Sequence, residues 1–142
     1  MVRIALILAA MVLFVGCSSQ SFDLTQRAQA YDAFVVEQSL IQVDKIHSFQ
    51  FEQWTGLGKQ HLILYRRFNE PYLIALNKPC FDLNHASVIS VNYHHNTLLA
   101  KFDSITVPNE IPVKCYIKSI HPLTKAQKKA ILAIGKVSKN KR

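Results

Sequence analysis

Two acidic residues near an arginine are the first candidates for chemistry in this chain. Glu70 comes shortly after Arg66, and Asp103 lies further along the chain. A pair of carboxyl groups beside a cation can act as general acid and base in a cleft. Structural ion pairs bring the same residue types together without catalysis, and we favour that interpretation. Trp54 and Tyr72 are the aromatic side chains expected to be partly exposed as binding residues.

Histidine is the second candidate residue type, because His85, His94 and His95 are close in sequence and could bind a metal ion. Adjacent residues of a strand point to opposite faces, so His94 and His95 could share a metal only in a turn. Neither a cysteine nor an acid stands at the spacing of a structural zinc site. We therefore expect a solvated turn, and neither a metal nor another cofactor. The usual nucleophile and phosphate-loop motifs are absent from the sequence, so no catalytic residue is assigned.

The N-terminal segment has the pattern of a secretory signal. Arg3 gives it a positive start, and residues 4–15 form an apolar run without a charged side chain. This run is shorter than the roughly 20 apolar residues of a transmembrane helix. We therefore expect residues 1–16 to be a signal peptide that is removed after export.

The end of that segment, Gly16-Cys17, resembles the bacterial lipobox, in which the cysteine receives diacylglycerol before cleavage. Cys17 is therefore the expected lipidation site, and several acyl chains together hold a protein stably on a membrane. In enterobacterial lipoproteins an aspartate after this cysteine causes retention in the inner membrane, and here the position holds Ser18. The resemblance implies the outer membrane, with the protein facing the periplasm. Residues 17–26 then form its lipidated tether.

Two cysteines, Cys80 and Cys115, remain once Cys17 is assigned to lipid. Because the periplasm is oxidising, we expect these two to form a disulfide. The alternatives are a metal pair or a catalytic thiol. Neither alternative is favoured by a CxxC spacing or by a histidine nearby in sequence.

The formal net charge of +8 is concentrated at the C-terminus. Residues 17–124 carry nine basic and nine acidic side chains, whereas residues 125–142 carry seven basic ones and no acid. A neutral exported domain argues against a nucleic-acid ligand. The basic segment is expected either to contact anionic lipid headgroups or to stay solvated without a partner.

Helical patterns stand at both ends of the mature chain. Residues 27–40 have helical composition and periodicity, which predicts a short N-terminal helix. Thr124 and Gln127 form a Thr-x-x-Gln capping box just before an apolar stretch, which predicts the start of an amphipathic C-terminal helix.

Between the helices, apolar and polar residues alternate with period two, as is typical of strands. The predicted strands are 61–67, 72–76, 88–93, 98–102 and 113–120, and the same alternation occurs around Phe49 and Phe51. We expect a turn at Asn69-Glu70-Pro71, and a second hairpin that joins 88–93 to 98–102. In the last strand Cys115 faces inward, where Cys80 could meet it. About six strands and two flanking helices predict a mostly-β (α+β) fold, as a small antiparallel barrel or curved sheet. The single globular domain is expected at 27–137, followed by a basic tail at 138–142.

With these strands placed, most of the mature chain is similar to a group of short proteobacterial envelope lipoproteins, catalogued as domain of unknown function 6491. The shared residues include Trp54, Leu57-Gly58, Arg67 to Leu73, Pro79-Cys80, Leu83, Ala86, Phe102-Asp103, Cys115, Ile117, Ile120 and Pro122. The resemblance implies an exported lipoprotein domain with one disulfide. No activity is established for the group, so no catalytic residue follows from it.

Three hypotheses about function follow. The first, which we favour, is a non-enzymatic envelope lipoprotein whose β domain binds a protein or another envelope component through an exposed aromatic or sheet-edge patch. The second is a periplasmic enzyme or small-ligand carrier, which requires Arg66, Glu70 and Asp103 to converge with Trp54 or Tyr72 in a pocket. The third is metal binding by the histidines at 85, 94 and 95.

Overall fold

Helix α1 (Leu24–Glu37) opens the part of the chain that the computed structural model describes, residues 23–134. Asp23 and Gln26 form a capping box. The Asp23 side chain accepts a hydrogen bond from the backbone N–H of Gln26, and the Gln26 side chain accepts one from the backbone N–H of Asp23. This box satisfies N–H groups that have no partner within the helix. The helix therefore begins three residues before the predicted start at residue 27, and residues 24–26 belong to the fold.

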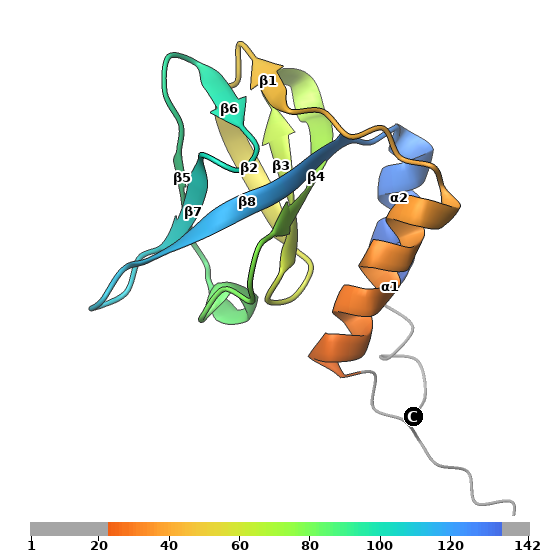
Figure 1. Ribbon diagram of the computed structural model, residues 1–142, viewed down its shortest axis with the longest axis horizontal. Coiled ribbons are helices and arrows are strands. Elements are labelled where there is room, and N and C mark those ends of the chain that lie inside the picture. Colours follow the sequence, from red (N-terminus) through yellow and green to blue (C-terminus); the bar gives the residue numbers. More distant parts are fainter. Residues whose placement is uncertain (1–22, 135–142) are drawn as a thin grey trace, which may run out of the picture.

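The main sheet has six antiparallel strands and curls into a nearly closed barrel (Figure 1). In order across the sheet these are β2 (Phe51–Gly56), β3 (His61–Arg66), β4 (Glu70–Leu76), β8 (Val113–Pro122), β7 (Ser104–Val107) and β5 (Ser90–Asn92). The mostly-β prediction is confirmed. The two edge strands, β2 and β5, leave a seam in the barrel wall.

A separate two-stranded ribbon is formed by β1 (Lys45–His47) and β6 (Thr97–Leu99). The predicted hairpin between 88–93 and 98–102 is therefore wrong, because β6 pairs with β1, and β5 pairs with β7. Burial explains this choice: Ile46 and Leu98 stand opposite each other in the ribbon, and both side chains are buried in the barrel interior. His95 and Asn96, both with positive φ, form the turn that leads into β6.

The β3–β4 connection is a short 3₁₀ helix, η1 (Arg67–Asn69). Glu70 is the first residue of β4 and pairs with Arg66, so it is a strand residue and not a turn residue as predicted. A second 3₁₀ helix, η2 (Leu83–His85), lies between β4 and β5.

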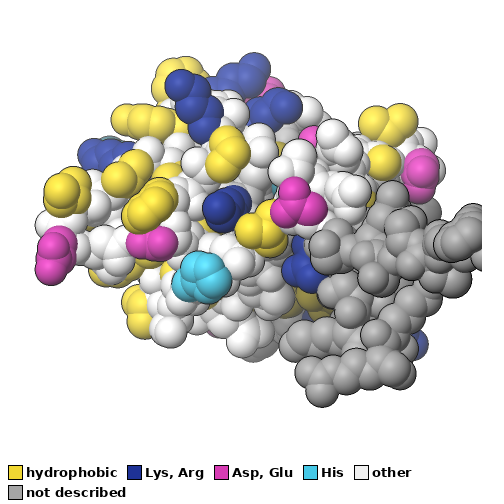
Figure 2. Space-filling model, turned by 90° about the horizontal axis from the view of Figure 1, so that it is seen from below, with side chains coloured by type: hydrophobic (Ala, Val, Ile, Leu, Met, Phe, Trp, Pro, Cys, Tyr) yellow, Lys and Arg dark blue, Asp and Glu magenta, His cyan; other side chains and the backbone are white. Residues whose placement is uncertain are grey.

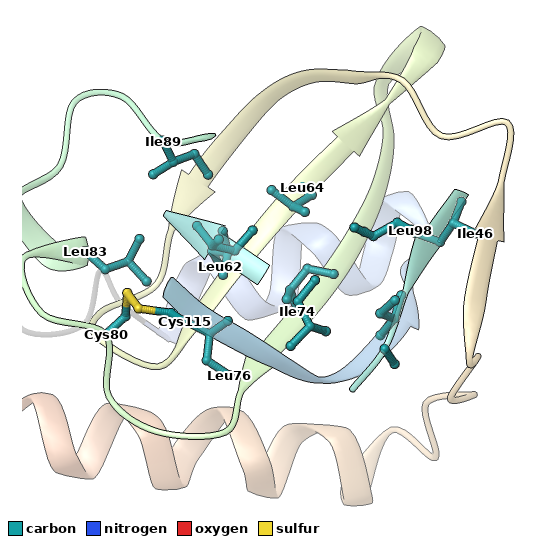
Figure 3. Packing of buried hydrophobic residues seen from close by; sticks show 14 of the residues in the cluster. Ile46, Leu62, Leu64, Ile74, Leu76, Cys80, Leu83, Ile89, Leu98 and Cys115 are labelled. Atoms are coloured by element: carbon teal, nitrogen blue, oxygen red, sulfur yellow. A yellow bond between two sulfur atoms is a disulfide. The ribbon is translucent and has the colours of Figure 1, made fainter. Parts of the chain in front are cut away.

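The barrel interior is filled by apolar side chains from every strand and from the ribbon (Figure 3). Leu62 and Leu64 of β3 lie beside Ile74 and Leu76 of β4, and all four side chains are fully buried. Each such side chain contributes about 1.5–3 kcal/mol when removed from water. The interior is therefore the larger of the two cores.

A second core lies on the outer face of the sheet, under α1 and α2 (Lys125–Ile134). Ile63 of β3 and Leu73 of β4 pack here against Tyr31 and Phe34 of α1 and Ile131 of α2. The predicted capping box at the start of α2 is confirmed, since the Gln127 N–H donates to Thr124 Oγ1 at 3.1 Å, and the Thr124 N–H donates to Gln127 Oε1 at 2.8 Å.

Cys80 and Cys115 form the expected disulfide, which joins the loop after β4 to the inward face of β8 with a Cα–Cα distance of 5.7 Å (Figure 3). The sequence separation is 35 residues. In the chain-entropy model, a loop of that size corresponds to roughly 3–4 kcal/mol of stabilisation. The disulfide therefore ties the segment between β4 and η2 to β8.

Two buried histidines connect α1 and the segment that follows it to the sheet. His61 is 2% exposed, and its Nε2 lies 2.9 Å from Asp32 Oδ1 of α1. His121 is 4% exposed, with Nδ1 3.2 Å from the Ile41 carbonyl oxygen and Nε2 3.1 Å from Ser119 Oγ. These contacts orient α1 over the outer core.

Burial lowers the pKa of both imidazoles. For His61 the burial outweighs the hydrogen bond and the charge of Asp32, which raise its pKa, and Lys118 and His121 lower it further. For His121 the burial outweighs the backbone carbonyl groups of Ile41 and Leu40, which raise its pKa. Both side chains are therefore held neutral in the folded protein at neutral pH.

We expect the free energy of unfolding to decrease as the pH is lowered below about 6.5, which is the ordinary histidine pKa. Below that value the unfolded chain binds protons that the folded chain, with its lowered pKa values, does not yet bind. The stabilisation is complete above about pH 6.5 and is lost progressively toward the folded-state pKa values. Urea unfolding at a series of pH values would measure this slope.

The same measurement is made on a double variant, His61→Gln/His121→Gln, and on a control variant, His95→Gln. The double variant should have a weaker pH dependence than the wild type, whereas His95→Gln, at an exposed turn position, should keep it. An unchanged slope in the double variant would contradict the assignment.

Candidate functional site

Arg66, Glu70 and Tyr72 form one polar cluster on a single face of the β3–β4 hairpin. Arg66 and Glu70 are directly opposite each other in the register, so their side chains share a face. Arg66 Nε donates to Glu70 Oε2 at 2.7 Å, and the Tyr72 hydroxyl donates to the same oxygen at 3.4 Å. Burial raises the pKa of the Tyr72 hydroxyl. The structure therefore brings together three of the five predicted binding residues.

Arg66 also holds the ribbon in place. Its Nη1 donates to the backbone carbonyl oxygen of His47, in β1, at 2.7 Å. Glu70 in turn orients the guanidinium group through the ion pair. The Arg66–Glu70 pair thus ties β1 to the β3–β4 hairpin, and its charges are committed to this contact.

Asp103 makes the corresponding contact on the other strand of the ribbon. Its side chain is 5% exposed, and Oδ2 accepts the Leu99 N–H of β6 at 2.7 Å. Oδ1 lies 3.7 Å from His94 Nδ1, whose side chain is 81% exposed. A buried carboxylate that accepts a backbone N–H is a structural acceptor first. Asp103 therefore fastens β6, whereas Arg66 fastens β1.

These contacts separate the residues that an acid–base site would need together. Glu70 is bonded to Arg66 and Tyr72, and Asp103 is bonded to Leu99 in another strand. Glu70 is thus engaged within the β3–β4 hairpin, whereas Asp103 is engaged with β6 of the ribbon. The geometry supports the interpretation of both as structural residues.

Trp54 lies elsewhere, at the seam of the barrel. Its indole packs against the interior core from β2, opposite Leu64 of β3, and is half-buried. A hollow opens beside it, which we call the Trp54 hollow. Its lining consists of Trp54, Gly56, Gly58, Leu83, Asn84, Ala86 and Ser87.

The two glycines shape this hollow. A Cβ on Gly56 would lie 3.2 Å from the Trp54 ring, which leaves no room for a side chain without a shift. Gly58 has a φ of +112°, a conformation that other residues rarely adopt. The result is an aromatic surface next to exposed backbone, in a hollow that Asn84 and Ser87 also line. An apolar ring with a few polar groups around it suits a sugar or peptide ligand.

The sequence indicated Trp54 but not the lining residues from the segment around η2. Asn84 and Ser87 come from the segment around η2, which follows β4 in the chain and meets β2 at the hollow. A local pattern could not have identified them, because small polar residues are common in loops.

The histidines proposed as metal ligands occupy separate places. His85 belongs to η2, whereas His94 and His95 lie in the exposed turn before β6. Among residues 23–134 there is no group of three or more histidine, cysteine or acidic side chains placed to hold a metal ion.

The predicted membrane contacts fall largely outside the described residues. Cys17 and the signal segment precede residue 23, and the predicted tail at 138–142 follows residue 134. Of the seven C-terminal basic residues, Lys125, Lys128 and Lys129 are described, and Lys128 Nζ lies 5.4 Å from the centre of the Tyr65 ring. Within the described range, neither helix has the length and hydrophobicity needed to cross a bilayer.

We expect Asp103→Ala to lower the free energy of unfolding by about 1–3 kcal/mol, because the Leu99 N–H loses its charged acceptor in a buried position. Urea unfolding of the wild type and the variant measures this difference. Glu110→Ala is the matched control: it removes an exposed acid and should change stability by less than about 0.5 kcal/mol. Equal stability of all three proteins would contradict a fastening role for Asp103.

Comparison with known proteins identifies one family. A family model described as a family of unknown function, DUF6491, matches residues 1–134. No curated protein and no solved structure matches the chain.

Proposed function

Because the chain belongs to the DUF6491 family, whose function is unknown, we propose its role from its own residues. It is an envelope lipoprotein, held by lipid on Cys17 at the periplasmic face of the outer membrane. Its β domain binds a ligand or partner of the envelope and does not catalyse a reaction.

The membrane anchor is supported by the N-terminal sequence. A positive start, an apolar run and Gly16-Cys17 follow one another in the order of a lipoprotein signal. The match to the family begins at residue 1, so it includes this segment together with the folded part. The disulfide between Cys80 and Cys115 is consistent with an oxidising compartment.

The arrangement of the two helices is compatible with that anchor. α1 and α2 pack against each other and run in opposite directions, so the chain enters α1 and leaves α2 toward the same end of the pair (Figure 1). A lipid before α1 and a basic segment after α2 would then be positioned to contact the same membrane. Each base near a negative surface contributes about 1 kcal/mol.

The observation that carries the binding role is that the candidate acids serve the fold. Glu70 orients Arg66, and Asp103 is buried against Leu99. The Trp54 hollow, in contrast, is lined by the Trp54 ring, the Asn84 amide and the Ser87 hydroxyl. The stability of the fold does not require these groups to stay accessible. We therefore assign ligand or partner binding to the Trp54 hollow.

The alternative is a periplasmic enzyme or small-ligand carrier that uses Arg66, Glu70 and Asp103. The convergence of Arg66, Glu70 and Tyr72 favours it in part. The engagement of Asp103, in the loop between β6 and β7, with the Leu99 N–H counts against it.

Labelling of cells with radioactive palmitate tests the anchor. The wild-type chain should incorporate label, and Cys17→Ala should incorporate none, because the acyl chains require that thiol. Cys80→Ser/Cys115→Ser is the control for unrelated thiol acylation and should still be labelled. Equal labelling of wild type and Cys17→Ala would refute lipidation at this residue.

Site-specific photo-crosslinking in cells tests the hollow. A benzophenone residue in place of the exposed Asn84 should give an adduct of defined mass, and one in place of the exposed Glu37 of α1 should not. Adding Trp54→Ala should reduce the Asn84 adduct several-fold, because the aromatic surface of the site is removed. Adducts of equal yield at both positions, or none at Asn84, would count against binding there.

A further inference from the structure

The outer face of β8 is covered by the helices at one end only. α1 and α2 lie over β3 and β4, where the outer core is formed, and the first half of β8 extends beyond them across the front of the barrel (Figure 1). Strand β8 alternates along this half: Cys115 and Ile117 are buried, and Lys114, Tyr116 and Lys118 are exposed. This half of the sheet therefore presents an uncovered face.

The loop between β6 and β7 adds two residues to that face. The Lys101 N–H donates to the Ile117 carbonyl oxygen at 2.8 Å, and the Ile117 N–H donates to the Asp103 carbonyl oxygen at 3.0 Å. The loop thus lies directly beside Tyr116 and Lys118. Together these residues form what we call the β8 outer surface: Lys101, Phe102, Lys114, Tyr116 and Lys118.

The β8 outer surface combines large exposed rings with cations. Phe102 is 75% exposed and Tyr116 is 47% exposed, and all three lysines are exposed. Basic and hydrophobic side chains gather along the side of the molecule where β8 lies (Figure 2). An exposed phenylalanine among lysines is unfavourable in water and favourable where an apolar layer lies beneath charged groups.

The three lysines are not neutralised by the fold. None of them makes an ion pair within residues 23–134. Strand β8 contains no acid, and the nearby carboxylate of Asp103 is buried against Leu99. The surface is therefore a local positive region on a domain whose formal charge over residues 17–124 is zero.

The neighbouring strand adds hydrogen-bond donors. Thr106 of β7 stands directly opposite Lys114, so the two side chains share the outer face. Asn92 Nδ2 donates to Thr106 Oγ1 at 2.8 Å, which leaves the hydroxyl proton of Thr106 available to a different acceptor. Lysine ammonium groups and this hydroxyl are all donors, which matches a ligand rich in negatively charged oxygens.

We propose that the β8 outer surface docks on the anionic leaflet of the membrane that carries the lipid anchor. The lysines contact lipid phosphates, and Phe102 and Tyr116 enter the interfacial layer beneath them. This inference rests on the proposed function, since the lipid on Cys17 keeps the domain near the leaflet. Each lysine shifts the docking equilibrium by about fivefold, so three lysines favour the docked orientation by roughly a hundredfold.

A bilayer fits this surface better than an acidic protein. The rings and lysines lie on one sheet face and an adjoining loop, and none of them lines the Trp54 hollow. Charge and apolar contact are the two requirements of a lipid interface, and neither requires shape complementarity.

Lysine footprinting tests the proposal on the full chain, purified from membranes and reconstituted into vesicles. One vesicle type contains phosphatidylcholine alone, and the other contains phosphatidylcholine with phosphatidylglycerol. Acetylation of Lys101, Lys114 and Lys118, followed by mass spectrometry, should be several-fold slower on the anionic vesicles. Lys59, in the β2–β3 turn, should react equally on both. High salt should remove the difference.

A pair of charge-matched variants separates this surface from net charge. Lys114→Gln/Lys118→Gln should abolish the protection of Lys101, whereas Lys45→Gln/Lys59→Gln should preserve it. Equal acetylation on both vesicle types overturns the proposal, as does equal loss of protection in the two variants. Protection in intact cells but not on vesicles would indicate a protein partner and would also overturn it.

The intact mass of the purified chain distinguishes failure of the proposed anchor from failure of the proposed docking. A chain without acyl groups refutes the proposed anchor, whatever the footprint shows. An acylated chain whose three lysines remain unprotected refutes docking and leaves the anchor in place.

Discussion

The structure depends on two strands that are buried on both faces. In β3 the residues from His61 to Tyr65 are all buried, because alternate side chains enter the barrel interior and the outer core. Strand β4 is buried in the same way from Leu73 to Leu76. A slip of one residue would exchange the two sets, placing Tyr65 in the interior and Leu64 under the helices, so the register of this hairpin is strongly specified. The helices and the barrel are thereby joined through the same two strands.

Polar residues in this protein mainly hold neighbouring elements together. Arg66 with Glu70 fastens one strand of the ribbon, Asp103 fastens the other, and His61 with Asp32 positions α1. The residues that resemble an acid–base pair in the sequence therefore have structural roles in the fold. What the fold leaves open are surfaces: the Trp54 hollow at the seam and the β8 outer surface. Both are suited to recognition, which is why we interpret the domain as a binding module.

Local sequence patterns predicted the elements that local interactions determine. The Thr124–Gln127 capping box, the β3–β4 hairpin and the inward orientation of Cys115 were all predicted correctly, since each depends on residues a few positions apart. The pairing of β6 was predicted wrongly. Proximity in sequence favoured β5 as its partner, but the burial of Leu98 against Ile46 joined it to β1, about fifty residues away. The His61–Asp32 contact was missed for the same reason, because it joins a helix to a strand.

The sequence by itself determined the fold class, the disulfide pair and the expectation of a lipid on Cys17, because these depend on composition, periodicity and short motifs. Only the tertiary structure decided which polar residues work together. It separated Glu70 from Asp103, brought Asn84 and Ser87 across the seam to Trp54, and placed Lys101 and Phe102 beside β8. The physical reason is that a curled sheet brings distant segments into contact through burial and backbone pairing. The periodicity of the sequence does not reveal which distant segments will meet.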